Sequence, residues 1–138
     1  MEDPPIPQGD YVAARRHGST VYSAGMTPRR AGVMQFTGPV RRDDIGAARA
    51  AARLACANAL RAVEATLDGG EAIASILTMT VYVVAETGFT EHSKVADFAS
   101  EFLREELEDR GLCSRCAIGV ANLPGGAMVE IQIVASVA

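Results

Sequence analysis

Two charged side chains lie within a largely apolar stretch of the chain, residues 113–134. Arg115 lies in the first of two β-branched runs and Glu130 in the second, with a Leu-Pro-Gly-Gly segment between them. Because Pro and Gly interrupt strands, the stretch predicts two strands joined by a turn. In one sheet, the guanidinium and the carboxylate would come close on an apolar surface, where an isolated charge is costly. We expect either a structural salt bridge or a functional pair, and composition favours neither.

The residue types limit the chemistry of such a pair. Arg115 offers a fixed cation that can bind a carboxylate through two hydrogen bonds, and Glu130 can hold a water molecule or transfer a proton. His17 and His92 fall in a predicted turn and at a predicted helix start, so we expect no Ser-His-Asp arrangement. No glycine-rich phosphate loop is present, and we expect no cofactor. The sequence predicts a pocket for a small substrate that carries a carboxylate.

Cys113 and Cys116 have the C-x-x-C spacing of redox and zinc sites. A zinc site needs more ligands, and the chain has only one further cysteine and two histidines. The redox motif opens a helix, whereas this one leads into a predicted strand. We therefore interpret the spacing as coincidental and expect no metal.

The composition is that of a globular domain. The chain has 138 residues, 49% hydrophobic and 22% charged, which is enough for one core. No apolar run reaches the length of a bilayer span and residues 1–7 do not resemble a signal segment, so we expect a cytoplasmic protein without membrane contact. The net charge is −4 and no aromatic residues interleave with the arginine pairs, so we expect no nucleic-acid partner. We divide the chain into a flexible arm, residues 1–10, and one domain, residues 11–138.

Periodicity and turn residues predict two helices among five strands. Asp43 or Asp44 can cap the first helix, and Thr90 the second. The order is ββαβαββ, which predicts an α+β domain with a single sheet and both helices on one face. The elements before the final two strands are expected at 11–16, 20–24, 45–67, 75–85 and 90–110, with a loop over 25–42 that contains a short strand near 33–36.

The alternation of side chains gives each predicted strand one fully apolar face, which the two helices can cover. On the strand that contains Arg115, this face is formed by Cys116, Ile118 and Val120, and Arg115 and Gly119 lie opposite. The remaining sheet face is mixed and apolar enough to need a cover, yet no helix is left for it. We therefore expect a second subunit on that face, with the two charges at or near the interface.

The run Ser114–Ile131 (SRCAIGVANLPGGAMVEI) resembles the C-terminal signature of the Rid family, also called the YjgF family. That signature has an Arg, a short apolar strand ending in Leu-Pro, and then Val-Glu-Ile. Similar segments occur in family order at residues 20–25, 57–60 and 80–82, so the resemblance covers nearly the whole chain from Tyr11. It implies a chorismate-mutase-like α+β fold and a homotrimer whose sheets face inward, with three pockets between subunits.

The resemblance also implies an activity. Members best known as enzymes hydrolyse reactive enamines and imines, such as 2-aminoacrylate and 2-imino acids, to 2-keto acids and ammonia without a cofactor. By position, Arg115 would clamp the substrate carboxylate, and Glu130, with the backbone near Ala117, would hold the attacking water. Tyr11 matches a tyrosine that lines the pocket.

Two positions of the implied pocket depart from the family pattern. Ala24 stands where the archetype has a serine, although Ser23 is adjacent, and Ser93 stands where it has an asparagine. Three functions follow from the residues together. The first is a deaminase of the 2-iminobutanoate/2-iminopropanoate type, and the second is a non-catalytic trimeric protein that binds or senses small carboxylates. The third is an endoribonuclease, an older family label that charge and residue types support less.

Overall fold

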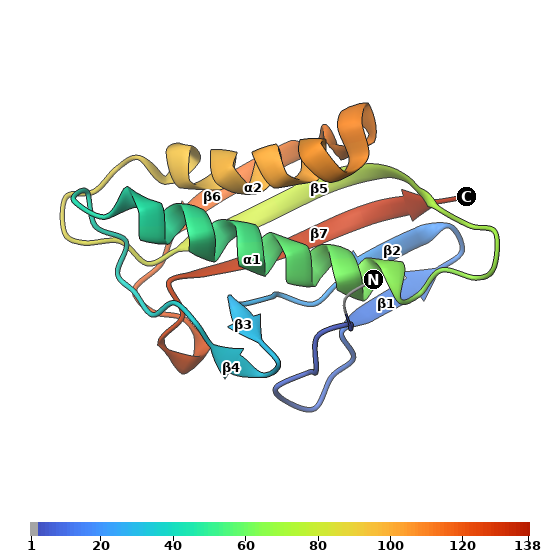
Figure 1. Ribbon diagram of the computed structural model, residues 1–138, viewed down its shortest axis with the longest axis horizontal. Coiled ribbons are helices and arrows are strands. Elements are labelled where there is room, and N and C mark those ends of the chain that lie inside the picture. The colour runs from blue at the N-terminus through green and yellow to red at the C-terminus, as the bar shows by residue number, and fades with distance from the viewer. Residues whose placement is uncertain (1–2) are drawn as a thin grey trace.

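The computed structural model describes residues 3–138, in which two helices cover one face of a five-stranded sheet (Figure 1). The strand order is β1-β2-β7-β5-β6, and β3 and β4 form a separate two-stranded ribbon. This is the α+β architecture that the sequence predicts. The elements are β1 (Ala14–His17), β2 (Thr20–Ser23), β3 (Arg29–Arg30), β4 (Val33–Met34), α1 (Ile45–Glu64), β5 (Ile73–Val83), α2 (His92–Leu107), β6 (Ser114–Gly119) and β7 (Val129–Val137).

Helix α1 lies flat against the sheet because its inner surface consists mostly of alanine. Asp44 caps its N-terminus, as predicted, by accepting a hydrogen bond from the backbone N of Ala47 at 3.3 Å. The helix ends at Glu64, where Thr66 donates its hydroxyl to the carbonyl of Val63 and interrupts the backbone pattern. The buried small residues of its inner surface are Ala48, Ala51, Ala52, Ala55, Cys56, Ala59 and Ala62.

Helix α2 packs beside α1 and passes over the edge strand β6 (Figure 1). The predicted cap at Thr90 is wrong, because the helix begins after Glu91, and Glu91 makes no side-chain capping bond. Among residues 3–138, neither helix combines the length and the apolar character that crossing a membrane requires.

The two strands of residues 113–134 are not neighbours in the sheet, so they do not form the hairpin that two strands joined by a turn would give. Strand β5 lies between them, parallel to β6 and antiparallel to β7. A parallel neighbour requires a crossover, and α2 provides it between β5 and β6. The Leu-Pro-Gly-Gly segment forms a short 3₁₀ turn at Pro124–Gly126, with Gly125 at φ 67°, and carries the chain past β5 to β7.

The predicted inward faces are correct for β7 and wrong for β6. On β6, Arg115 and Ala117 are half-buried towards α2, whereas Cys116 and Ile118 are exposed on the open face. Gly119 also faces α2, because a Cβ there would lie 2.6 Å from Nε2 of His92. The alternation of apolar residues on β6 predicted the wrong inward face, because α2 packs on this strand with polar side chains. On β5 the alternation places Leu77, Met79, Val81 and Val83 on one apolar face. Met79, Val81 and Val83 are buried, whereas Leu77 is exposed beside a register shift.

An ion pair ties β1 to the loop between α1 and β5. The two terminal nitrogens of Arg16 donate to the carboxylate oxygens of Glu71 at 2.6 and 2.7 Å, and one also reaches the carbonyl of Thr66. The bond from Arg16, together with one from the backbone N of Asp68, lowers the pKa of Glu71 to about 2. The fold therefore gains stability from the ionised carboxylate.

Glu71→Gln should lower the midpoint of thermal unfolding at neutral pH, because the amide cannot form the ion pair. The native pKa lies below the ordinary value of about 4.3, so this contribution is present above pH 4.3 and is lost as the pH falls towards 2. Circular dichroism melts of both proteins should converge over that range. Asp68→Asn is the control, since Asp68 lies 3.9 Å from Arg16 and is exposed. A constant difference down to pH 2 would contradict the assignment.

Candidate functional site

Arg115 is held against α2 by three polar side chains. Its Nη1 donates to Oγ of Ser100 at 2.8 Å and lies 2.9 Å from Oδ1 of Asp97. Its Nη2 donates to Oγ of Ser93 at 2.8 Å and to the Ser93 carbonyl at 3.1 Å. The guanidinium is therefore fixed beside the first turns of α2, with Ala117 two residues along on the same face of β6.

Sequence reasoning missed Asp97 and Ser100, although a signal for them exists. Ser93, Asp97 and Ser100 follow the spacing i, i+4, i+7 and so form a polar stripe along α2. Such a stripe is normally read as a solvated surface. Here it faces a strand, because Arg115 lies on the helix-covered side of β6 and needs polar partners there.

Glu130 lies on the opposite face of the sheet. On β7 it stands directly across from Tyr82 of β5, and its side chain lies over Gly25. A Cβ at position 25 would come within 2.9 Å of the Glu130 Cδ, so a larger residue there would displace the carboxylate from its present position. Within residues 3–138 no ion pair or side-chain hydrogen bond engages Glu130, and its burial raises its pKa.

Ala24 supplies no hydroxyl group on the Glu130 side, where the family archetype has a serine. It is half-buried at the end of β2, where its N–H donates to the carbonyl of Ala13 at 2.8 Å. The adjacent Ser23 does not replace the missing serine. Its buried Oγ donates to the carbonyl of Ala24 and accepts from the backbone N of Ile133, so it is used inside the sheet.

The charged pair predicted from the sequence therefore does not meet within one chain. Arg115 is level with Met79 on the helix-covered face, and Glu130 is level with Tyr82 on the open face, with β5 between their strands. The reason is the inserted strand, which no pattern within residues 113–134 reveals. The candidate residues form two half-sites. The Arg115 half-site contains Arg115, Ser93 and Ala117, and the Glu130 half-site contains Glu130, Ala24 and Gly25.

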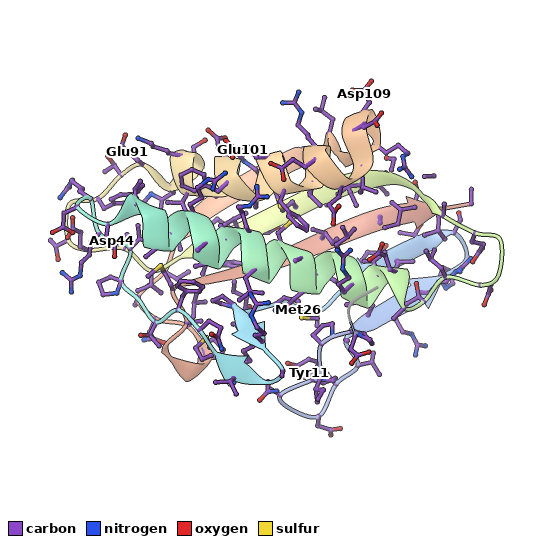
Figure 2. All side chains as sticks on the ribbon, in the orientation of Figure 1. Tyr11, Met26, Asp44, Glu91, Glu101 and Asp109 are labelled. Atoms are coloured by element: carbon purple, nitrogen blue, oxygen red, sulfur yellow. The ribbon has the colours of Figure 1, made fainter. Side chains whose placement is uncertain are left out.

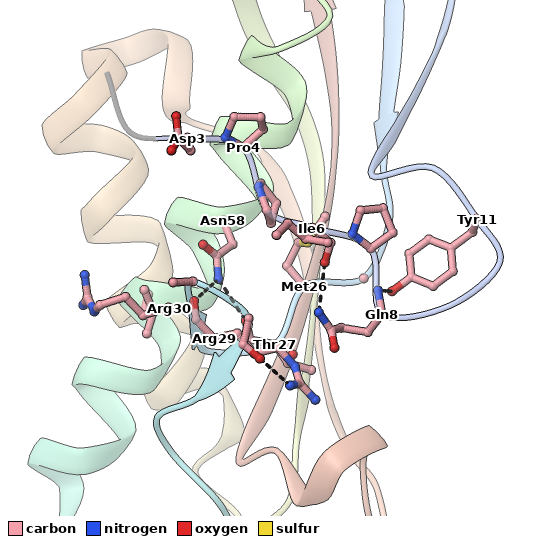
Figure 3. A pocket seen from close by; sticks show the side chains of 16 residues that line it. Asp3, Pro4, Ile6, Gln8, Tyr11, Met26, Thr27, Arg29, Arg30 and Asn58 are labelled. Atoms are coloured by element: carbon pink, nitrogen blue, oxygen red, sulfur yellow. Dashed lines mark hydrogen bonds between the residues drawn. The ribbon is translucent and has the colours of Figure 1, made fainter.

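Tyr11 belongs to neither half-site directly; it borders a cavity of about 700 Å³ that also reaches Gly25 (Figure 3). The N-terminal residues 3–8 form one wall of this cavity, and their proline-rich sequence gave no sign of it. Asn58 fixes another wall, since its amide nitrogen donates to the carbonyls of Thr27 and Arg29 at 3.0 and 2.8 Å. Figure 2 places Tyr11 below α1, away from the outer surface of α2 that carries Glu91 and Glu101.

The two cysteines of the C-x-x-C motif have different surroundings. Cys116 is exposed on the open face, whereas Cys113 is half-buried, and burial raises the pKa of its thiol. Within residues 3–138, no three metal-ligating side chains gather closely enough to hold an ion.

The chain is similar to proteins of a known family. The sequence model of the family described as Endoribonuclease L-PSP matches residues 1–137. The chain belongs to this family, which is the YjgF/Rid family. Protein TCP17 of Trypanosoma cruzi is 30% identical over 128 residues, which cover 91% of this chain and 80% of that protein.

Solved structures of the family share the fold. Protein Atu1372 of Agrobacterium tumefaciens, described as of unknown function, superposes with a TM-score of 0.87 at 32% identity, over 96% of this chain and 86% of that one. The YjgF gene product of E. coli superposes with a TM-score of 0.70 at 23% identity, over 99% and 94% of the chains. The mixed sheet with two helices is thus the family fold, as the resemblance implied.

Glu130→Gln should raise the midpoint of thermal unfolding at neutral pH. The folded state raises the pKa of this carboxyl, so its favourable contribution is complete below the ordinary pKa of about 4.3 and is lost as the pH rises through the native value. The amide avoids the cost of an ionised, half-buried group, and the two proteins should melt alike at low pH. Glu108→Gln, at an exposed site, is the control. Lower stability of Glu130→Gln at pH 7 would contradict this account.

Proposed function

We propose that the protein is a cofactor-independent hydrolytic deaminase of enamines and imines, with its active site between two copies of the chain. The observation that carries the proposal is the division of the candidate site into two half-sites of complementary chemistry. One copy would supply the Arg115 half-site with a carboxylate-binding cation. Its neighbour would supply Glu130, whose raised pKa suits a group that takes up and releases protons.

The surfaces of the described chain support an assembly of this kind. The open face of the sheet exposes Tyr22, Leu77 and Ile118, an apolar set that favours contact with another protein surface. The Arg115 and Glu130 half-sites lie on different surfaces, so pairing them joins unlike patches of two copies. Such an interface closes into a ring when the rotation permits. We propose a homotrimer with the sheets facing inward, because three is the number of subunits that the family resemblance implies.

The proposed reaction is hydrolysis of a 2-imino acid to a 2-keto acid and ammonia. Arg115 binds the substrate carboxylate and so orients the C=N group. Glu130, with the backbone near Ala117, holds a water molecule and removes its proton as the oxygen bonds to the imine carbon. The same proton goes to the imine nitrogen and gives a carbinolamine. Glu130 then moves the hydroxyl proton of the carbinolamine to the nitrogen, the C–N bond breaks, ammonia leaves and the C=O bond forms. An enamine such as 2-aminoacrylate first takes a proton on carbon and gives up one from nitrogen, which converts it to the imine.

A trimer that binds small carboxylates without turnover is the second candidate. Two observations favour it. Ala24 offers no hydroxyl where the family archetype has one, and the terminal nitrogens of Arg115 are already engaged by α2. The same pocket serves both candidates, so only a reaction rate separates them.

The direct test couples an amino-acid oxidase to the protein and follows the decay of the released imino acid with a trapping reagent. The wild type should accelerate the decay, and Arg115→Ala should lose most of the effect, because a charge-assisted, oriented contact is removed. Circular dichroism checks that the variant is folded. No acceleration by the wild type with several amino acids would reject the deaminase in favour of the binding protein.

Mixing two inactive variants tests the shared site. If Arg115→Ala and Glu130→Gln chains are unfolded together and refolded as mixed assemblies, some interfaces combine two intact half-sites. Random mixing of equal amounts should restore about a quarter of the wild-type activity, since each half-site is drawn independently. Each variant refolded alone is the control, and sedimentation equilibrium gives the number of copies. Full inactivity of the mixture would show that both residues act within one chain.

A further inference from the structure

The terminal nitrogens of Arg115 are already engaged within the chain that carries them. Ser93 accepts hydrogen bonds from Nη2 at its hydroxyl and its carbonyl, and Ser100 accepts one from Nη1. Nη1 also lies 2.9 Å from a carboxylate oxygen of Asp97. These nitrogens form the end of the planar fork with which arginine grips a carboxylate. An approaching carboxylate therefore meets a cation whose fork is occupied.

Asp97 differs from the two serines because it carries a charge. A serine hydroxyl orients the guanidinium but leaves its charge available, whereas an adjacent carboxylate offsets that charge. The Asp97 side chain is 60% exposed and that of Arg115 only 19%. Asp97 is therefore the more exposed member of the pair, and a ligand that reaches Arg115 from solvent would meet Asp97 there. It occupies the place that a substrate carboxylate needs.

We propose that Asp97 is a specificity-determining residue, which competes with the ligand carboxylate for Arg115 and so reduces the preference of the site for carboxylate ligands over neutral ones. The proposal rests on the proposed function, because it takes Arg115 as the cation that meets the ligand. A carboxylate ligand has to displace Asp97, whereas a neutral carbonyl or imine of the same shape faces no charged competitor. The substrate class of this chain therefore extends to imines and enamines without a carboxylate.

Binding of a stable keto acid and of its neutral amide tests the proposal without requiring turnover. Isothermal titration calorimetry would use pyruvate and pyruvamide with the assembled wild type, Asp97→Asn and Glu101→Gln. Asparagine keeps the shape of Asp97 and removes its charge. Glu101→Gln removes one charge from the same helix, at an exposed residue whose ion-pair partner is Arg49 at 3.9 Å.

Asp97→Asn should bind pyruvate more tightly than the wild type, by up to about fivefold, the upper limit set by removal of a partly exposed ion pair. Its affinity for pyruvamide should not change, and Glu101→Gln should behave as the wild type. Asp97→Ser also removes the charge and should give the same selective shift. Agreement of the two variants would show that the shift comes from loss of the charge and not from contacts of the asparagine.

The proposal is overturned if both Asp97 variants bind pyruvate no more tightly than the wild type, including the case in which none of the proteins binds it. Weaker binding by the variants would assign Asp97 to the orientation of Arg115, and equal tightening by Glu101→Gln would reduce the effect to net charge. The imine assay is independent of these results. An inactive wild type together with a selective gain in Asp97→Asn would reject the deaminase and keep the role of Asp97. An active wild type without that gain would support the deaminase and reject the role of Asp97.

Discussion

The burial of one sheet face beneath α1 and α2 is the constraint on which the rest of the structure depends. The alanine-rich surface of α1 brings its backbone close to β2 and β7, and α2 is left to cover the β6 edge. With two helices used on one side, the described chain has nothing to place on the other. The mixed composition of that open face, with Tyr22, Ile118 and Glu130, follows from this one-sided arrangement.

The same arrangement determines the surroundings of the two charges. Arg115 is on the covered face, where a guanidinium requires partners, and α2 provides a carboxylate, two hydroxyls and a carbonyl. Glu130 is on the open face, where burial by neighbouring strands raises its pKa and no cation compensates it within residues 3–138. One charge is thus satisfied inside the fold, and the other remains available for a ligand or a second chain. This asymmetry is the physical basis of the two-copy site proposed above.

Membership of the YjgF/Rid family is consistent with a wide range of uses for one scaffold, and the side chains around the site have to distinguish them. In this chain the distinguishing features are local. Ala24 removes a hydroxyl, Ser23 next to it is used within the sheet, and Asp97 offsets the charge of Arg115. Each alters the contacts a ligand can make without altering the fold. Differences of this size decide whether a pocket turns over an imine, prefers a neutral compound or only binds.

The amino-acid sequence was enough to predict the element types, a helix cap at Asp43 or Asp44, the inward faces of β5 and β7 beyond the register shift, and the family, because periodicity and short motifs are local properties. It also singled out Arg115 and Glu130 as the charges that need an explanation. The folded chain was needed to show that β5 separates their strands, that the two side chains lie on opposite faces, and that Asp97 and Ser100 reach Arg115. Strand order and the partner of an edge strand depend on contacts between distant segments. A turn signal such as Leu-Pro-Gly-Gly carries no information about which strand is inserted beside it.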